Sequence, residues 1–348
     1  MIVVMQKPEQ GERSSDVQKR LDAVREAVQA QDLRSDVSRG TGQTVVGVLG
    51  ELSPEKAEAL MHTLRAMPGV AFVQRVSTPY KLVSREFPGQ SVTVQVNGVS
   101  VGSKQLLVIA GPCAAESEEQ LEATARAVKE LGAHALRAGA YKPRTSPYSH
   151  QGTRQAGVIM LDRVRKKVGL PVVTEVTRID HIISLVDKAD VLQVGMRNMQ
   201  NFELLTALAA TDRPVLLKRS VAASLDELLF AAEYIARGNP RIILCLRGIL
   251  PIRGVETRAQ PDFDAIPLLK QKTRLPVIYD PSHPAGRADL VIPHSLGAIA
   301  CGADGLLVEV HPNPPEAISD NEQQLTFEQF GQLMTEVRKV AAAVGRTV

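Results

Sequence analysis

The run Leu106-Leu107-Val108-Ile109-Ala110, followed at once by Gly111-Pro112-Cys113, is the first of eight short apolar segments in the second part of this 348-residue chain. The other segments lie at 135–140, 172–176, 191–194, 215–218, 242–246, 277–279 and 306–310. Near-continuous apolar strands that alternate with helical stretches are typical of a parallel sheet buried on both faces. Eight such units in about 240 residues predict a (β/α)8 barrel over residues 105–348. A doubly wound open sheet is the alternative, but no Gly-rich dinucleotide fingerprint follows the first run.

Upstream of the barrel, residues 1–76 are predicted to form a small domain. Strands are expected at 1–5, weakly around Val37, and at 44–49 and 70–76, with helices at 16–29 and 53–67. Ser53-Pro54 is a strong helix start, since serine caps a first turn and proline fits its first position. The order β-α-β-β-α-β is that of a ferredoxin-like domain.

Residues 77–104 are predicted to connect the two parts. Valine-rich runs at 92–96 and 99–101 flank Asn97-Gly98, which is the strongest short signal for a β-hairpin. We expect this hairpin to cover the bottom of the barrel.

The composition excludes several classes of protein. The chain is 44% hydrophobic and 23% charged, as in ordinary globular proteins, and its net charge of +3 argues for neither a nucleic-acid nor a membrane partner. Aromatic residues make up 3% and tryptophan is absent, which disfavours base stacking. Three widely spaced cysteines indicate a reducing compartment, and no long apolar run or signal-peptide pattern occurs. We therefore expect a cytoplasmic protein.

The predicted barrel strands end in polar residues, and barrel active sites lie at those ends. One subset, Cys113, His283, Glu309 and Asp320, offers sulfur, nitrogen and oxygen ligands. Such a mixed set suits Mn²⁺, Fe²⁺, Co²⁺ or Zn²⁺ better than Mg²⁺ or Ca²⁺, which prefer oxygen alone. Taken singly, each has a plainer explanation: a core thiol, a structural histidine or a turn cap.

A second subset is cationic, and its members are Arg137, Lys142, Arg144, Arg197, Lys218 and Arg247. Pro143 and Pro147 stiffen the loop that carries Lys142 and Arg144. Arginine binds phosphate oxygens in pairs and lysine acts as a point charge, so this set could neutralise two phosphates and a carboxylate. A different interpretation of Lys218 is that it forms an imine with a carbonyl substrate.

Together these segments resemble a known family. The motifs are Gly111-Pro-Cys113, Lys142-Pro-Arg-Thr-Ser-Pro-Tyr-Ser149, Gln193-Val-Gly-Met-Arg-Asn-Met-Gln-Asn201, Leu217-Lys-Arg219, Asp280-Pro-Ser-His283 and Val308-Glu-Val-His-Pro312. They are similar to those of 3-deoxy-D-arabino-heptulosonate 7-phosphate (DAHP) synthase, type I beta class. The resemblance covers residues 106 to about 325, and residues 1–76 resemble the ferredoxin-like (ACT-like) regulatory extension of some members.

The resemblance implies an aldol-like condensation of phosphoenolpyruvate with erythrose 4-phosphate at the start of the shikimate pathway. It makes Cys113, His283, Glu309 and Asp320 the ligands of a divalent metal, with Mn²⁺ first among the candidates. It assigns phosphoenolpyruvate to Arg137, Lys142, Arg197, Lys218 and Arg247, and the aldose phosphate to Arg144 and Thr145. Lys142, between the two anion groups, is our hypothesis for the proton donor to the aldehyde oxygen, with Cys113 and His283 completing the catalytic set.

Two alternatives to this activity stay open. A sibling phosphoenolpyruvate-dependent sugar-acid synthase would use a different acceptor, and a silent sensor would bind an aromatic amino acid without turnover. The resemblance also suggests feedback inhibition by tyrosine or phenylalanine through residues 1–76, and a homotetramer. The plainer expectation for residues 1–76 is an oligomerisation or lid domain.

Overall fold

The structure is a computed structural model that describes residues 1–348 except 9–11, 40–43, 76–77, 88–90, 144–145 and 252–255. Its strands are β1 Ile2–Met5, β2 Arg34–Arg39, β3 Thr44–Leu49, β4 Val70–Gln74, β5 Val94–Val96, β6 Val99–Val101, β7 Leu107–Gly111, β8 Ala135–Arg137, β9 Val172–Glu175, β10 Val191–Val194, β11 Val215–Lys218, β12 Ile242–Leu246, β13 Val277–Tyr279 and β14 Gly305–Glu309. Its helices are α1 Ser14–Gln29, α2 Pro54–Arg65, α3 Glu118–Glu130, α4 Arg154–Val168, α5 Ile179–Leu185, α6 Phe202–Ala209, α7 Leu225–Ala236, α8 Ala265–Lys272, α9 Ser282–Ala285, α10 Val291–Ala300 and α11 Phe327–Ala343.

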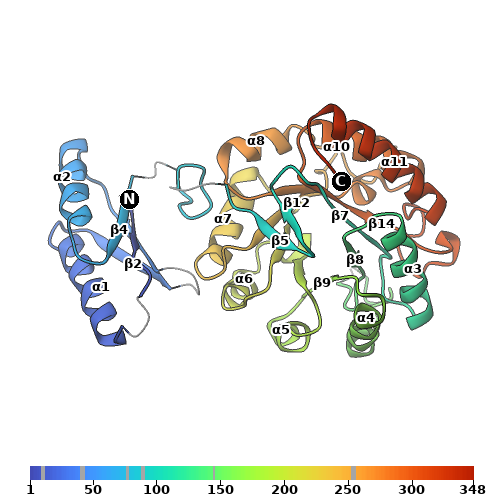
Figure 1. Ribbon diagram of the computed structural model, residues 1–348, viewed down its shortest axis with the longest axis horizontal. Helices are drawn as coiled ribbons and strands as arrows, with labels where there is room; N and C mark the ends of the chain where they lie inside the picture. The colour runs from blue at the N-terminus through green and yellow to red at the C-terminus, as the bar shows by residue number, and fades with distance from the viewer. Residues whose placement is uncertain (9–11, 40–43, 76–77, 88–90, 144–145, 252–255) are drawn as a thin grey trace.

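Strands β7 to β14 pair in parallel and close on themselves, since β14 pairs with β7 and β9 with β10. Helices surround this ring (Figure 1). Within the described residues the barrel has eight strands, so the predicted (β/α)8 architecture is confirmed. Strand β8 is shorter than the predicted run 135–140, because the chain turns after Arg137 so that Gly139 can pair with the loop after β7.

Alternation along the strands decides what faces the barrel interior. Leu107, Ile109, Val173, Leu216 and Ile243 belong to one buried cluster inside the barrel, whereas their neighbours pack against the surrounding helices. Successive side chains of a strand point to opposite faces, so the residue two places after an inner apolar one also points inward. At the carboxyl ends of most strands these inward positions are charged, as at Arg137, Lys218 and Glu309, and this places the candidate site inside the mouth of the barrel.

The N-terminal part forms an antiparallel sheet in the order β2-β3-β1-β4, and the predicted ferredoxin-like fold is confirmed. Helices α1 and α2 cover the face of the sheet that points away from the barrel (Figure 1). The expected cap of α2 is present, since Ser53 accepts a hydrogen bond from the backbone of Lys56. On the other face, Phe87 from the connector is buried with Ile2, Val4 and Val45.

The hairpin β5–β6 lies where the sequence places it, with Asn97 and Gly98 both at positive φ as a tight two-residue turn requires. Its four valines, Val94, Val96, Val99 and Val101, are at most 3% exposed. They join the cluster formed by the inner apolar residues of the barrel. The hairpin therefore closes the barrel at the end opposite the charged mouth.

The connector is also fastened to helix α7. The carboxylate of Glu233 accepts hydrogen bonds from the backbone nitrogens of Lys81, Leu82 and Val83, at 2.9, 2.8 and 3.1 Å for the nearest oxygen. Tyr80 is 2% exposed and packs edge-on against Phe230 of the same helix. The chain between the two domains is thus a bound strap over residues 80–83.

A membrane-spanning segment is not found among the helices of the described residues, since none combines the length and the apolar character that a bilayer crossing requires.

Candidate active site

Residues from distant parts of the chain meet in one pocket at the mouth of the barrel. Its lining includes these sequence-predicted site residues: Arg137, Lys142, Arg197, Lys218, Arg247, His283 and Asp320. Arg144 and Thr145, predicted for the aldose phosphate, lie outside the described residues. Within the described part of the chain, six cationic side chains and two carboxylates line the pocket, so its charge favours an anionic ligand.

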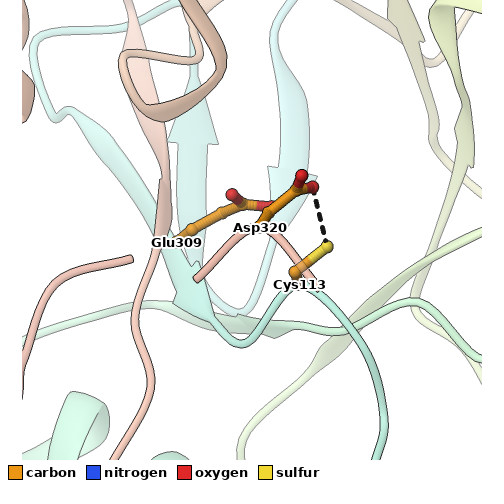
Figure 2. Close-up of side chains that lie close together, drawn as sticks. All are labelled: Cys113, Glu309 and Asp320. Atoms are coloured by element: carbon orange, nitrogen blue, oxygen red, sulfur yellow. Dashed lines mark hydrogen bonds between the residues drawn. The ribbon is translucent and has the colours of Figure 1, made fainter. Parts of the chain in front are cut away.

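Three of the four predicted metal ligands meet directly behind the pocket. One ligand atom each of Cys113, Glu309 and Asp320 lies within 4.8 Å of the others (Figure 2). The Cys113 thiol donates to Asp320 Oδ2 at 3.1 Å. Glycine at position 111, two residues before Cys113, allows the end of β7 to lie close to the end of β8, because a Cβ there would lie 2.2 Å from the carbonyl oxygen of Arg137.

The fourth predicted ligand, His283, is adjacent to this group. Its Nε2 lies 3.7 Å from Glu309 Oε1, and its Nδ1 lies 2.7 Å from Asp280 Oδ2. Burial lowers the pKa of His283 despite these carboxylates, which favours the neutral ring that a metal requires. Sulfur, nitrogen and oxygen donors of this kind fit a borderline divalent transition ion.

Two buried ion pairs each link the ends of two strands. Arg137 donates to Glu309 Oε1 at 2.5 Å, and Lys218 is paired with Asp280. Burial alone would raise the pKa of Asp280, but His283 and Lys218 hold it well below its usual range. The same holds for Glu309, whose pKa is lowered by His283 and Arg137 against the effect of burial. Both carboxylates are therefore ionised, and breaking either pair would leave a charge in a buried site.

Arg247 differs from these paired cations. It is 5% exposed, donates to the sulfur of Met196 at 2.6 Å, and ion-pairs with no carboxylate among the described residues. Its Nε is buried and has no hydrogen-bond partner within the same part of the chain. Burial lowers the pKa of Arg247. A buried guanidinium in this state needs an anion to complete its environment.

Lys142 lines the cationic pocket and also contacts Cys113 of the candidate metal-ligand cluster. Its Nζ donates to the carbonyl oxygen of Cys113 at 2.7 Å and lies 2.9 Å from Cys113 Sγ. Burial raises the pKa of the Cys113 thiol, and Lys142 partly opposes that rise. The ammonium group thus lies at the boundary between the donor cluster and the open pocket.

Several pocket residues were not predicted from the sequence. Arg258 donates to Asp320 Oδ1 at 2.9 Å, and Glu175 and Gln193 line the pocket. Burial raises the pKa of Glu175, with Lys142 and Lys218 opposing it. Glu175 ends β9 and Asp280 directly follows β13, so their positions were visible in the sequence, whereas Arg258 lies far beyond the end of β12.

The fold and the pocket together define a class of protein: a (β/α)8 barrel whose mouth gathers cations beside a sulfur, nitrogen and oxygen donor cluster. The comparisons with known proteins narrow this class. Residues 89–344 match the DAHP synthetase I family, and residues 1–78 match the DAHP synthase ferredoxin-like domain. The chain belongs to the DAHP synthetase I family.

Similar proteins of known name support this membership. The chain is 42% identical over 346 residues to the phospho-2-dehydro-3-deoxyheptonate aldolase of Thermotoga maritima, covering 99% of both chains. The solved structure of that DAHP synthase covers 100% of this chain and 98% of its own, with a TM-score of 0.76 at 42% identity. A 2-dehydro-3-deoxyphosphooctonate aldolase of Desulfotalea psychrophila is 30% identical and covers 72% of this chain and 96% of its own.

Proposed function

We propose that this enzyme condenses phosphoenolpyruvate with erythrose 4-phosphate and water to give DAHP and phosphate, at the start of the shikimate pathway, and that it requires a divalent metal. Family membership and the full-length similarity to a phospho-2-dehydro-3-deoxyheptonate aldolase support the reaction. The observation that best supports an anionic substrate concerns Arg247. This buried cation lines the pocket and has no carboxylate partner in the described residues.

The binding roles follow from depth and charge. Arg137, Lys218 and Arg247 lie at most 5% exposed, and with Lys142 and Arg197 they would bind the phosphate and carboxylate of phosphoenolpyruvate. Arg144 and Thr145 would bind the aldose phosphate, as the family motif implies. Arg137 keeps its charge, because Glu309 raises the pKa of its guanidinium against the effect of burial.

Cys113, His283, Glu309 and Asp320 would hold the metal, and Mn²⁺ is our first candidate before Fe²⁺, Co²⁺ or Zn²⁺. When bound, the metal would supply Lewis-acid polarisation of the aldehyde oxygen.

In the reaction that we propose, C3 of phosphoenolpyruvate attacks the aldehyde carbon, forming the new carbon–carbon bond. Lys142 Nζ, 2.9 Å from Cys113 Sγ, donates a proton to the oxygen on which negative charge develops. Water then adds to C2 and inorganic phosphate leaves. The surrounding cations hold both substrates in reach of each other and stabilise the anions formed.

We further propose that residues 1–76 form a regulatory domain that binds tyrosine or phenylalanine, that 77–104 are the connector, and that 105–348 are the catalytic barrel of a cytoplasmic homotetramer. The ferredoxin-like match over residues 1–78 supports the first part of this proposal.

The function is tested by following phosphoenolpyruvate in metal-stripped protein, with and without erythrose 4-phosphate and Mn²⁺. We expect consumption only when the aldose and the metal are both present. Turnover without metal would contradict the metal requirement, and no turnover with any of the four metals would contradict the reaction.

A panel of aldose phosphates distinguishes this function from that of a sibling sugar-acid synthase with a different acceptor. The similarity to a 2-dehydro-3-deoxyphosphooctonate aldolase makes this alternative worth testing. We expect the four-carbon aldose to be preferred, because the heptonate relative matches the whole chain. Preference for a five-carbon aldose would favour the sibling.

A further inference from the structure

The segment 319–325, which supplies Asp320, does more than carry one candidate ligand. Asp320 has a φ of +53°, an unusual conformation for a residue other than glycine, and both of its carboxylate oxygens are engaged. Oδ2 accepts from the thiol of Cys113, and Oδ1 accepts from Arg258 at 2.9 Å. The contact with Arg258 leaves Oδ2 as the oxygen directed at the sulfur.

Gln323, three residues further on, reaches the second carboxylate. Its Nε2 donates to Glu309 Oε2 at 2.6 Å, while its Oε1 accepts from Arg258 at 3.1 Å. The side chain is 2% exposed, so water does not easily replace these bonds. Because Arg258 fixes the oxygen end of the amide, the nitrogen end must face Glu309. Each carboxylate oxygen has two lone pairs, so Glu309 Oε2 can still bind a metal.

The side chain of Gln324 holds Cys113, the third candidate ligand, by its backbone nitrogen. Its Oε1 accepts from the backbone nitrogen of Cys113 at 3.0 Å, and its Nε2 donates to the carbonyl oxygen of Ser319 at 2.9 Å. The backbone of Leu325 donates to the carbonyl oxygen of Glu309 at 2.9 Å, which holds the segment along the end of β14. Gln324 is 1% exposed.

We propose that Arg258, Gln323 and Gln324 are positioning residues that hold Asp320, Glu309 and Cys113 in the arrangement that receives the divalent metal. None of the three touches the metal in this proposal. They act by orienting the oxygens and the sulfur before the ion arrives, so that less conformational freedom is lost on binding. The inference rests on the proposed metal site, and it assigns a role to residues outside the ligand set.

The test compares Gln323→Met with Gln329→Met in the full-length protein. Methionine keeps the length of the side chain and removes the amide. Gln329 is a matched control, because its amide caps α11 by accepting from the backbone of Thr326 at 2.9 Å. Mn²⁺ affinity of metal-stripped protein is measured by calorimetry, and the sulfur–metal charge-transfer absorption is recorded with Co²⁺.

We expect Gln323→Met to weaken Mn²⁺ binding by about 10- to 100-fold, the range found when partners of metal ligands are removed. The control should bind Mn²⁺ as the unmodified protein does. If Gln323→Met bound Mn²⁺ within about twofold of the unmodified protein, the proposal would be overturned, because loss of a ligand's partner is expected to weaken binding at least about tenfold.

Arg258→Met keeps the test decisive if Gln323→Met does not fold, because the Arg258 side chain is 43% exposed and its loss leaves the core intact. We expect it to weaken Mn²⁺ binding while the Co²⁺ absorption persists at saturating metal. Unchanged binding in Arg258→Met would likewise overturn the proposal. If the unmodified protein binds no metal, the proposed function fails instead, so the two failures are distinguishable.

Discussion

The ammonium group of Lys142 lies 2.9 Å from Cys113 Sγ and its side chain lines the pocket, which is why we propose it as the proton donor. We predict that Lys142→Met lowers kcat by about 10²- to 10⁴-fold, the usual contribution of a positioned general acid. Mn²⁺ affinity should change far less, since the four ligands remain. Steady-state kinetics and calorimetry measure the two effects.

Lys339→Met is the control for this change, because Lys339 is 66% exposed and pairs only with Glu336 of its own helix in the contacts described. Near-normal turnover of Lys142→Met would rule out the proton-donor role.

At the scale of residues, charged side chains at predicted strand ends identified many of the site residues, whereas the neutral amides of the site could not be found in this way. Arg137, Lys218 and Glu309 could be placed from the sequence because period-two alternation carries an inner apolar position to a charged one. Gln323 and Gln324 carry no charge and lie beyond the last strand, so no pattern singled them out. The Lys218–Asp280 pair joins strands that are not neighbours in the sheet, so its detection required the closed barrel.

Among the elements, the barrel strands were located to within about one residue except β8, which ends at Arg137 although the predicted run extended to 140. The edge strand β2 was only a weak prediction. Its sequence, Arg34-Ser-Asp-Val-Ser-Arg39, has a single apolar residue, because an edge strand of this sheet needs little apolar surface. The strap over residues 80–83 had no sequence signal, since its partner Glu233 is a lone carboxylate on a distant helix.

That strap leads to a prediction about stability. Glu233→Ala removes the acceptor of three backbone N–H groups, and we expect a loss of about 2 kcal/mol or more in unfolding free energy, because buried donors left unpaired are costly. Glu233→Gln keeps one oxygen and should lose less. Denaturant unfolding measures the loss, and proteolysis tests for exposure of the connector.

Glu336→Ala, at an exposed pair on α11, is the control and should leave both readouts unchanged. Equal stability of Glu233→Ala and this control would show that the strap does not need the carboxylate.

For the whole molecule, the functions proposed for the two domains can be tested separately. Deleting residues 1–76 should leave the condensation measurable, because the barrel holds every described residue of the pocket. It should abolish inhibition by tyrosine or phenylalanine. The deletion uncovers Phe87, so folding of the barrel is checked by circular dichroism before kinetics. Unchanged sensitivity to both amino acids would contradict a regulatory role for this domain.

The hairpin β5–β6 limits the route by which ligands enter and leave the barrel. Its buried valines fill one end of the barrel, so a molecule bound at the mouth has a single way in and out. Arg137, Lys218 and Arg247 lie deep, while Arg258 lies at the rim. With phosphoenolpyruvate assigned to the deep cations, the four-carbon aldose must arrive second. In the proposed reaction the order of binding is then set by geometry, because the substrate that binds deepest must enter first.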